Sequence, residues 1–267
     1  MSVTSAEAAF KAGDVAQALQ NLQQSVRQDP SNAKLRVFLA QLLMLQGDWD
    51  RAVTQLKLVG EIDAGALPMA HAYSTAIQCE RLRVDVFAGA RGPLLFGDPE
   101  PWIAQLMQSL TLLGQGRTQQ AADLRAQAFE TAPTTAGSLN GTSFEWIADA
   151  DSRLGPILEV LLNGAYYWVP LHRITHVTVE APSDARDLVW LPAQFQWSNG
   201  GEAMGLIPVR YPGSEQSDDT AIRLARKTEW REIGPDAYAG LGQRVLTTDG
   251  PEIGLLDLRE LRLEAAS

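Results

Sequence analysis

Two aspartates and an arginine at alternate positions are the residues of this sequence that most suggest chemistry. They are Asp149, Asp151 and Arg153, in the run DADSRLGP. In an extended segment alternate residues share one side, so the two carboxylates could work as a general acid and a general base if their surroundings separated their pKa values. The alternative is structural, with Arg153 pairing with an aspartate or an aspartate accepting backbone N–H bonds. We favour the structural interpretation and keep a hydrolase as the alternative.

Other patterns that could support catalysis or ligand binding are weak. His172 and His176 lie four residues apart in a segment that resembles a strand, which would separate their rings by roughly 13 Å, too far to share an ion. The sequence contains no G-x-S-x-G, phosphate-binding loop, dinucleotide fingerprint or metal-binding cysteine pair. Cys79 lies in a helical pattern and is expected to be a small buried hydrophobe. We therefore predict no catalytic residues, no metal and no cofactor.

The elements that must position these residues include a helical unit that repeats in the N-terminal half of the sequence. Gly13 and Gly47 are 34 residues apart, the length of a tetratricopeptide helix-turn-helix unit. Gly13 precedes Pro30 by 17 residues, and Gly116 precedes Pro133 by the same distance. Glycine permits the turn between two helices and proline ends the second helix. Both spacings predict tetratricopeptide-like helix pairs, about seven helices in all, with 66–90 as one long helix or a degenerate pair.

The hydrophobic period changes along the chain, and this change predicts an α+β protein. Residues 1–132 are expected to form the tetratricopeptide-like all-α domain, and 133–143 (TAPTTAGSLNG) have the composition of a linker. Residues 144–267 alternate with a period of two and are expected to form an antiparallel β-rich domain. Asn163-Gly164 between two apolar runs predicts a hairpin with a type I′ turn.

Five tryptophans lie in the predicted β-rich half and could stack on ligands. In so small a domain we interpret them mainly as packing residues; they are Trp146, Trp168, Trp190, Trp197 and Trp230.

Charge and composition limit the possible partners. The net charge is −10, and most of the acidic excess lies after residue 132, so nucleic acids and anionic membranes are disfavoured as partners. The sequence has one cysteine, no basic and apolar leader at its N-terminus and no run of roughly 18 apolar residues. We expect a cytoplasmic protein.

A curved stack of helix pairs would leave a concave face suited to a partner helix. Alignment of the glycines places six residues at positions that usually line this face, although ordinary packing between helices is as good an interpretation for each one. The candidate residues of this groove are Val37, Gln41, Met44, Ile103, Leu106 and Leu110.

A longer segment then carries a family resemblance. The run DADSRLGPILEVLLNGAYYWVPLHRI, followed by DLVWLPAQF, IPVRYPGS and ARKTEW, resembles the ImpE/SciE/TagJ family of bacterial type VI secretion accessory proteins. The resemblance extends over nearly the whole chain. It includes a signature segment without an assigned role, comprising Asp149, Asp151, Arg153, Leu154, Gly155, Pro156, Tyr167, Trp168 and Pro170.

The resemblance implies a non-enzymatic adaptor. Proteins of this family are thought to bind the N-terminal helix of the small contractile-sheath subunit, and in some systems to associate with the AAA+ ATPase ClpV. The family supplies no catalytic residues to transfer. Besides this adaptor and the hydrolase, a general scaffold for protein interactions stays a third hypothesis.

Overall fold

The N-terminal half is helical, as the glycine spacing predicts. The computed structural model describes residues 3–264. Gly13, Gly47 and Gly116 adopt left-handed backbone angles, with φ of 86°, 71° and 75°, at the turns between paired helices. The helices are α1 (Val3–Lys11), α2 (Val15–Gln28), α3 (Ala33–Leu45), α4 (Trp49–Ile62), α5 (Leu67–Phe87), α6 (Pro101–Gly114) and α7 (Thr118–Thr131). Within residues 3–264 no helix is both long and apolar enough to cross a membrane.

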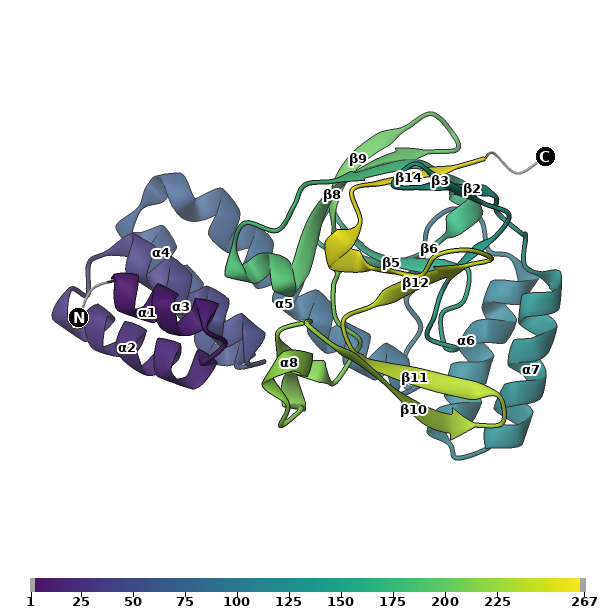
Figure 1. Ribbon diagram of the computed structural model, residues 1–267, viewed down its shortest axis with the longest axis horizontal. Helices are drawn as coiled ribbons and strands as arrows, with labels where there is room; N and C mark the ends of the chain where they lie inside the picture. Colours follow the sequence, from purple (N-terminus) through teal and green to yellow (C-terminus); the bar gives the residue numbers. More distant parts are fainter. Residues whose placement is uncertain (1–2, 265–267) are drawn as a thin grey trace.

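The seven helices do not form one continuous curved stack. Helices α1 to α4 gather at one end of the molecule, whereas α6 and α7 lie at the other end, beside the β-rich region (Figure 1). The long helix α5 runs between these two groups. The segment 66–90 is therefore one long helix rather than a helical pair, and the array is interrupted where the third repeat lacks its glycine.

The C-terminal half is built from short strands. The largest sheet has the order β1-β6-β5-β9-β8-β7-β14-β2-β3, a smaller one has the order β13-β12-β4, and β10 pairs with β11. Among the strands that the structure describes, every pairing is antiparallel except β1 with β6. The strands are β1 (Leu94–Leu95), β2 (Gly137–Leu139), β3 (Thr142–Phe144), β4 (Ile147–Asp149), β5 (Ile157–Leu162), β6 (Ala165–Pro170), β7 (Ile174–Val179), β8 (Trp190–Trp197), β9 (Glu202–Pro208), β10 (Thr228–Gly234), β11 (Ala237–Gly242), β12 (Val245–Thr248), β13 (Ile253–Gly254) and β14 (Glu260–Leu263).

The predicted fold class is confirmed, and the predicted hairpin is present. Asn163 and Gly164 both have positive φ, 48° and 79°, as a type I′ turn between β5 and β6 requires. The predicted linker at 133–143 is wrong in its second part, because β2 and most of β3 lie there and β2 pairs with β14. These strands are too short to show an alternating pattern, and β14, the other partner of β2, is more than a hundred residues away.

The two halves share one core. Trp168 of β6 and Trp190 of β8 are buried in the same apolar cluster as residues of α3, α5 and α6. Phe87 of α5 packs against Trp168, and Tyr73 of α5 stacks on Trp190 with 6.0 Å between ring centroids. Strand β1 from the helical half also extends the large sheet. Helix α5 is thus the element that joins helices to sheet.

Candidate functional site

Asp149, the first residue of the family signature, lies in a buried hydrogen-bonded network. Its Oδ2 accepts from Nε and Nη2 of Arg244 at 3.0 and 2.7 Å, and its Oδ1 accepts from the hydroxyl of Tyr211 and the backbone N–H of Asp151, both at 2.9 Å. The side chains of Asp149 and Arg244 are fully buried. Burial raises the pKa of Asp149 to about 6, against the lowering effect of the Arg244 guanidinium.

Asp151 and Arg153 form a second part of this network. Both oxygens of Asp151 accept from the guanidinium of Arg153, at 2.9 and 2.6 Å, and they also accept from the backbone N–H groups of Arg153 and Gly240. The Arg153 guanidinium lies 4.6 Å from the ring centroid of Phe87 in α5. Each carboxylate oxygen of Asp149 and Asp151 thus accepts two hydrogen bonds in a buried site. This geometry removes the structural argument for a hydrolase that uses them.

The network continues into the seam between α5 and the sheet. Glu159 of β5 accepts from Nε and Nη2 of Arg83 at 2.6 and 2.8 Å, and from the hydroxyl of Tyr166 at 2.6 Å. Arg244 lies 3.3 Å from the same carboxylate and links it to Asp149. Burial would raise the pKa of Glu159, but the guanidinium groups of Arg83 and Arg244 lower it to about 2.

Other signature residues shape the same region. Leu154 and Trp168 are buried, and the indole N–H of Trp168 donates to the Tyr166 hydroxyl at 2.7 Å. Gly155 has φ of 55°, and a Cβ there would lie 2.4 Å from Phe129 of α7. Sequence reasoning missed Glu159, Arg83 and Arg244. A signal for Glu159 was available, since a lone acid interrupts the apolar strand ILEVLL.

The predicted groove is corrected at four of its six positions. Met44, Ile103, Leu106 and Leu110 are at most 3% exposed and belong to the shared core, so a partner could reach them only by opening the protein. The loop after β9 also covers the end of α3, where Arg210 donates to the carbonyl of Leu45 at 2.9 Å. Repeat alignment identified the apolar faces correctly but could not show that the C-terminal half covers them.

Val37 and Gln41 lie in a different environment. They line a hollow of about 630 Å³ on α3, together with residues of α1 and the segment Ser183–Ala185. Gln41 is itself buried and Val37 is partly exposed. The prediction that they contact a partner stays a prediction.

A larger opening runs along α5, and we name it the α5 groove. It has a volume of about 770 Å³. One wall is formed by α5, and the other comes from the β5–β6 turn and β9. Its residues on α5 are Met69, His71, Ala72, Tyr73, Thr75, Ala76 and Cys79, and those opposite include Leu161, Asn163, Gly164, Met204, Gly205 and Leu206.

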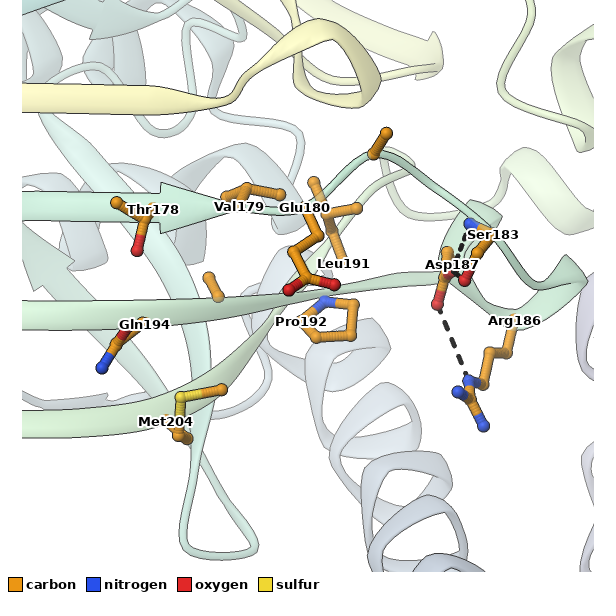
Figure 2. Close-up of a pocket in the computed structure, with 12 residues that line it drawn as sticks. Thr178, Val179, Glu180, Ser183, Arg186, Asp187, Leu191, Pro192, Gln194 and Met204 are labelled. Carbon is orange, nitrogen blue, oxygen red and sulfur yellow. Dashed lines mark hydrogen bonds and ion pairs between the residues drawn. The ribbon is translucent and has the colours of Figure 1, made fainter.

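The α5 groove continues into a second pocket of about 450 Å³, and the two share Arg186, Pro192 and Met204. Figure 2 shows Pro192 and Met204 on neighbouring strands, with Arg186 to one side and joined to Asp187. Met204 is 65% exposed, the largest value among the exposed large apolar residues of the described chain. The Arg186 guanidinium lies 5.1 Å from the ring centroid of Tyr73. The groove is therefore mainly apolar, with a cation at the junction of its two parts.

Cys79 lies at the inner wall of the α5 groove. Its Sγ is 3.6 Å from the carbonyl oxygen of Gly164. Burial raises the pKa of this thiol to about 11, so the thiolate is scarce at neutral pH and the residue serves packing.

Comparison with known proteins identifies relatives of both halves. Residues 141–262 match the family model described as ImpE protein, and residues 9–75 match a tetratricopeptide repeat model. The crystal structure of protein VPA1032 from Vibrio parahaemolyticus superposes with a TM-score of 0.87 at 27% identity, over 97% of each chain. A Pseudomonas aeruginosa protein described as type VI secretion system accessory component TagJ is 51% identical over 97% of this chain and 91% of its own length.

The matches confirm the resemblance drawn from the DADSRLGP and YYWVP segments, which lie within the residues that the ImpE model matches. With this identity over almost its whole length, the chain belongs to the ImpE family, which includes the type VI secretion accessory component of Pseudomonas aeruginosa.

Proposed function

We propose that this protein is a non-enzymatic type VI secretion adaptor that holds the amphipathic N-terminal helix of the small sheath subunit in the α5 groove. It thereby links that subunit to the AAA+ ATPase ClpV and modulates sheath assembly or recycling. The observation that carries the proposal is an open apolar groove along α5 in a chain 51% identical to a type VI secretion accessory component. A match to tetratricopeptide repeats, which commonly bind peptides, supports it.

The shape of the α5 groove suits a helix. Its α5 wall extends from Met69 to Cys79, which corresponds to roughly 15 Å or three helical turns. An amphipathic helix could place residues at positions i, i+3, i+4 and i+7 against this wall and against Met204. At about 25 cal/mol per Å2, several hundred Å2 of apolar contact gives micromolar affinity once the cost of association is subtracted.

Calorimetry with a synthetic peptide of the sheath subunit's N-terminal helix tests the proposal. We expect micromolar binding to the full chain. Met204→Glu and Ala72→Glu should weaken it at least tenfold, because each puts a charge where an apolar helix face must pack. Both residues are exposed, so the fold should tolerate the changes.

Val84→Glu is the matched control, because Val84 lies on α5, is 48% exposed and is outside the groove. This variant should bind the peptide as the native protein does. Equal weakening by all three changes, or no binding by the native chain, would refute the proposal. If Val37→Glu weakened binding and Met204→Glu did not, the hollow on α3 would replace the α5 groove as the site.

A further inference from the structure

A second open surface lies on the outer face of β4, far from the α5 wall in sequence. Ile147 and Asp149 of this strand are buried, whereas Ala148 and the flanking Trp146 and Ala150 lie on the opposite face because side chains alternate. Thr247 of β12 pairs with Ala148 and is also partly exposed. Small side chains thus form a shallow floor.

Two hollows meet over this floor. One, of about 360 Å³, lies between β4 and the chain at Pro133 and Pro156, and includes Trp146. The other, of about 450 Å³, is bounded by Trp230 and Tyr238 of the β10–β11 hairpin. Both include Ala150 and Thr247, so the hollows are continuous. We name the combined surface the aromatic hollow; it consists of Trp146, Ala148, Ala150, Trp230, Tyr238, Thr247 and Glu252 with the neighbouring prolines.

The aromatic residues of this surface are unusually exposed for their size. Trp146, Trp230 and Tyr238 are 40%, 43% and 50% exposed. Trp230 pairs with Gly240, and Tyr238 pairs with Glu232. Residues that pair directly share a face of the hairpin, and so do alternate residues of one strand, so Trp230 and Tyr238 lie on the same face. Trp230 also packs against buried Tyr211, with 5.6 Å between ring centroids, which fixes its orientation. The exposed ring of Trp230 is therefore held by the fold.

The polar groups of these rings have no hydrogen-bond partner among residues 3–264. The buried Trp102, Trp168 and Trp190 each donate their indole N–H to a protein acceptor, at 2.7 to 2.8 Å. In the part of the chain that the structure describes, the indole N–H groups of Trp146 and Trp230 and the hydroxyl of Tyr238 donate to no protein acceptor. A polyproline II segment has no internal hydrogen bonds and presents its carbonyl oxygens, which such donors can bind.

The charges around the aromatic hollow have one sign. Glu252 lines one hollow, and at the other end Asp249 accepts from the backbone N–H of Glu145 and lies beside Trp146. Among the described residues that line the two hollows there is no lysine, arginine or histidine. This potential favours a ligand with a positive charge near its end.

We propose that the aromatic hollow binds a proline-rich segment of a partner protein, in the polyproline II conformation and flanked by an arginine or lysine. Prolines pack against the rings of Trp146, Trp230 and Tyr238, the free indole and phenol groups donate to its carbonyl oxygens, and the basic residue faces Glu252. This surface is separate from the α5 groove and does not depend on the function proposed there.

Fluorescence anisotropy with the full chain tests this inference. The probe is a labelled peptide of proline–proline–alanine repeats with an arginine at one end, and the control peptide has the prolines replaced by glycine. We expect micromolar binding of the first peptide and at least tenfold weaker binding of the second. Trp230→Ala and Tyr238→Ala should each weaken binding at least tenfold, and Thr247→Arg should do so by filling and charging the floor.

Two matched variants make the test specific. Glu252→Gln should weaken binding of the arginine peptide severalfold and leave an arginine-free version unchanged, whereas Met204→Glu in the α5 groove should leave both unchanged. The inference is overturned if the native chain binds neither peptide at millimolar concentration, or if the glycine peptide binds equally well. It is also overturned if Tyr238→Ala, folded by circular dichroism, keeps the native affinity.

Discussion

The two faces of strand β4 differ sharply in burial, although their residues alternate within a stretch of a few positions. On the inner face Asp149 is fully buried and its oxygens accept four hydrogen bonds. On the outer face Trp146, Ala148 and Ala150 border an open hollow. The residues with the most reactive side chains therefore build the fold, whereas the alanines beside them, Ala148 and Ala150, are partly exposed. An unusual charged motif is thus as well explained by a buried network as by an active site.

Removal of Arg244 should have the largest effect. Arg244→Met leaves Asp149 and Glu159 buried without their shared cation, so the free energy of unfolding should fall by about 3–5 kcal/mol. Urea denaturation measures this loss. A loss below about 1 kcal/mol would mean that the inner face does not depend on its ion pairs.

The pH dependence of stability should show the role of Glu159. Its pKa in the folded protein, about 2, lies below the ordinary value of 4.5, so its contribution is present above pH 4.5 and is lost as pH falls toward 2. The shift corresponds to roughly 3 kcal/mol. Glu159→Gln lacks this contribution, so the difference in unfolding free energy between native protein and variant should shrink below pH 4.5. A constant difference from pH 7 to pH 3 would contradict the ion-paired state.

The smallest effect is expected on the outer face. Trp146→Ala removes a ring that is 40% exposed, and should change the unfolding free energy by less than about 1 kcal/mol. Trp168→Ala, at a fully buried indole, should cost about 3–5 kcal/mol and provides the matched comparison. Thermal unfolding of both variants checks the contrast. Similar losses would show that both indoles belong to the core.

Local patterns predicted much of this fold. The glycines at 13, 47 and 116 mark real turns, and Asn163-Gly164 forms the predicted hairpin. The short strands β2 and β3 were missed because they join the sheet only through the pairing of β2 with β14, far away in sequence. The apolar faces of α3 and α6 were recognised, but sequence periodicity does not identify what covers a face. For that reason the α5 groove and the aromatic hollow emerged only from tertiary structure.

Strand β1 pairs in parallel with β6, and helix α5 packs against Trp168 and Trp190. The β-rich half therefore depends on the helical half for its folding. A fragment that begins near residue 144 would lack strands at both edges of its sheet, β1 at one edge and β2 with most of β3 at the other, and would present two large indoles to water. Such a fragment should aggregate instead of folding, so point substitutions in the intact chain, rather than truncation, are the way to assign binding to either half.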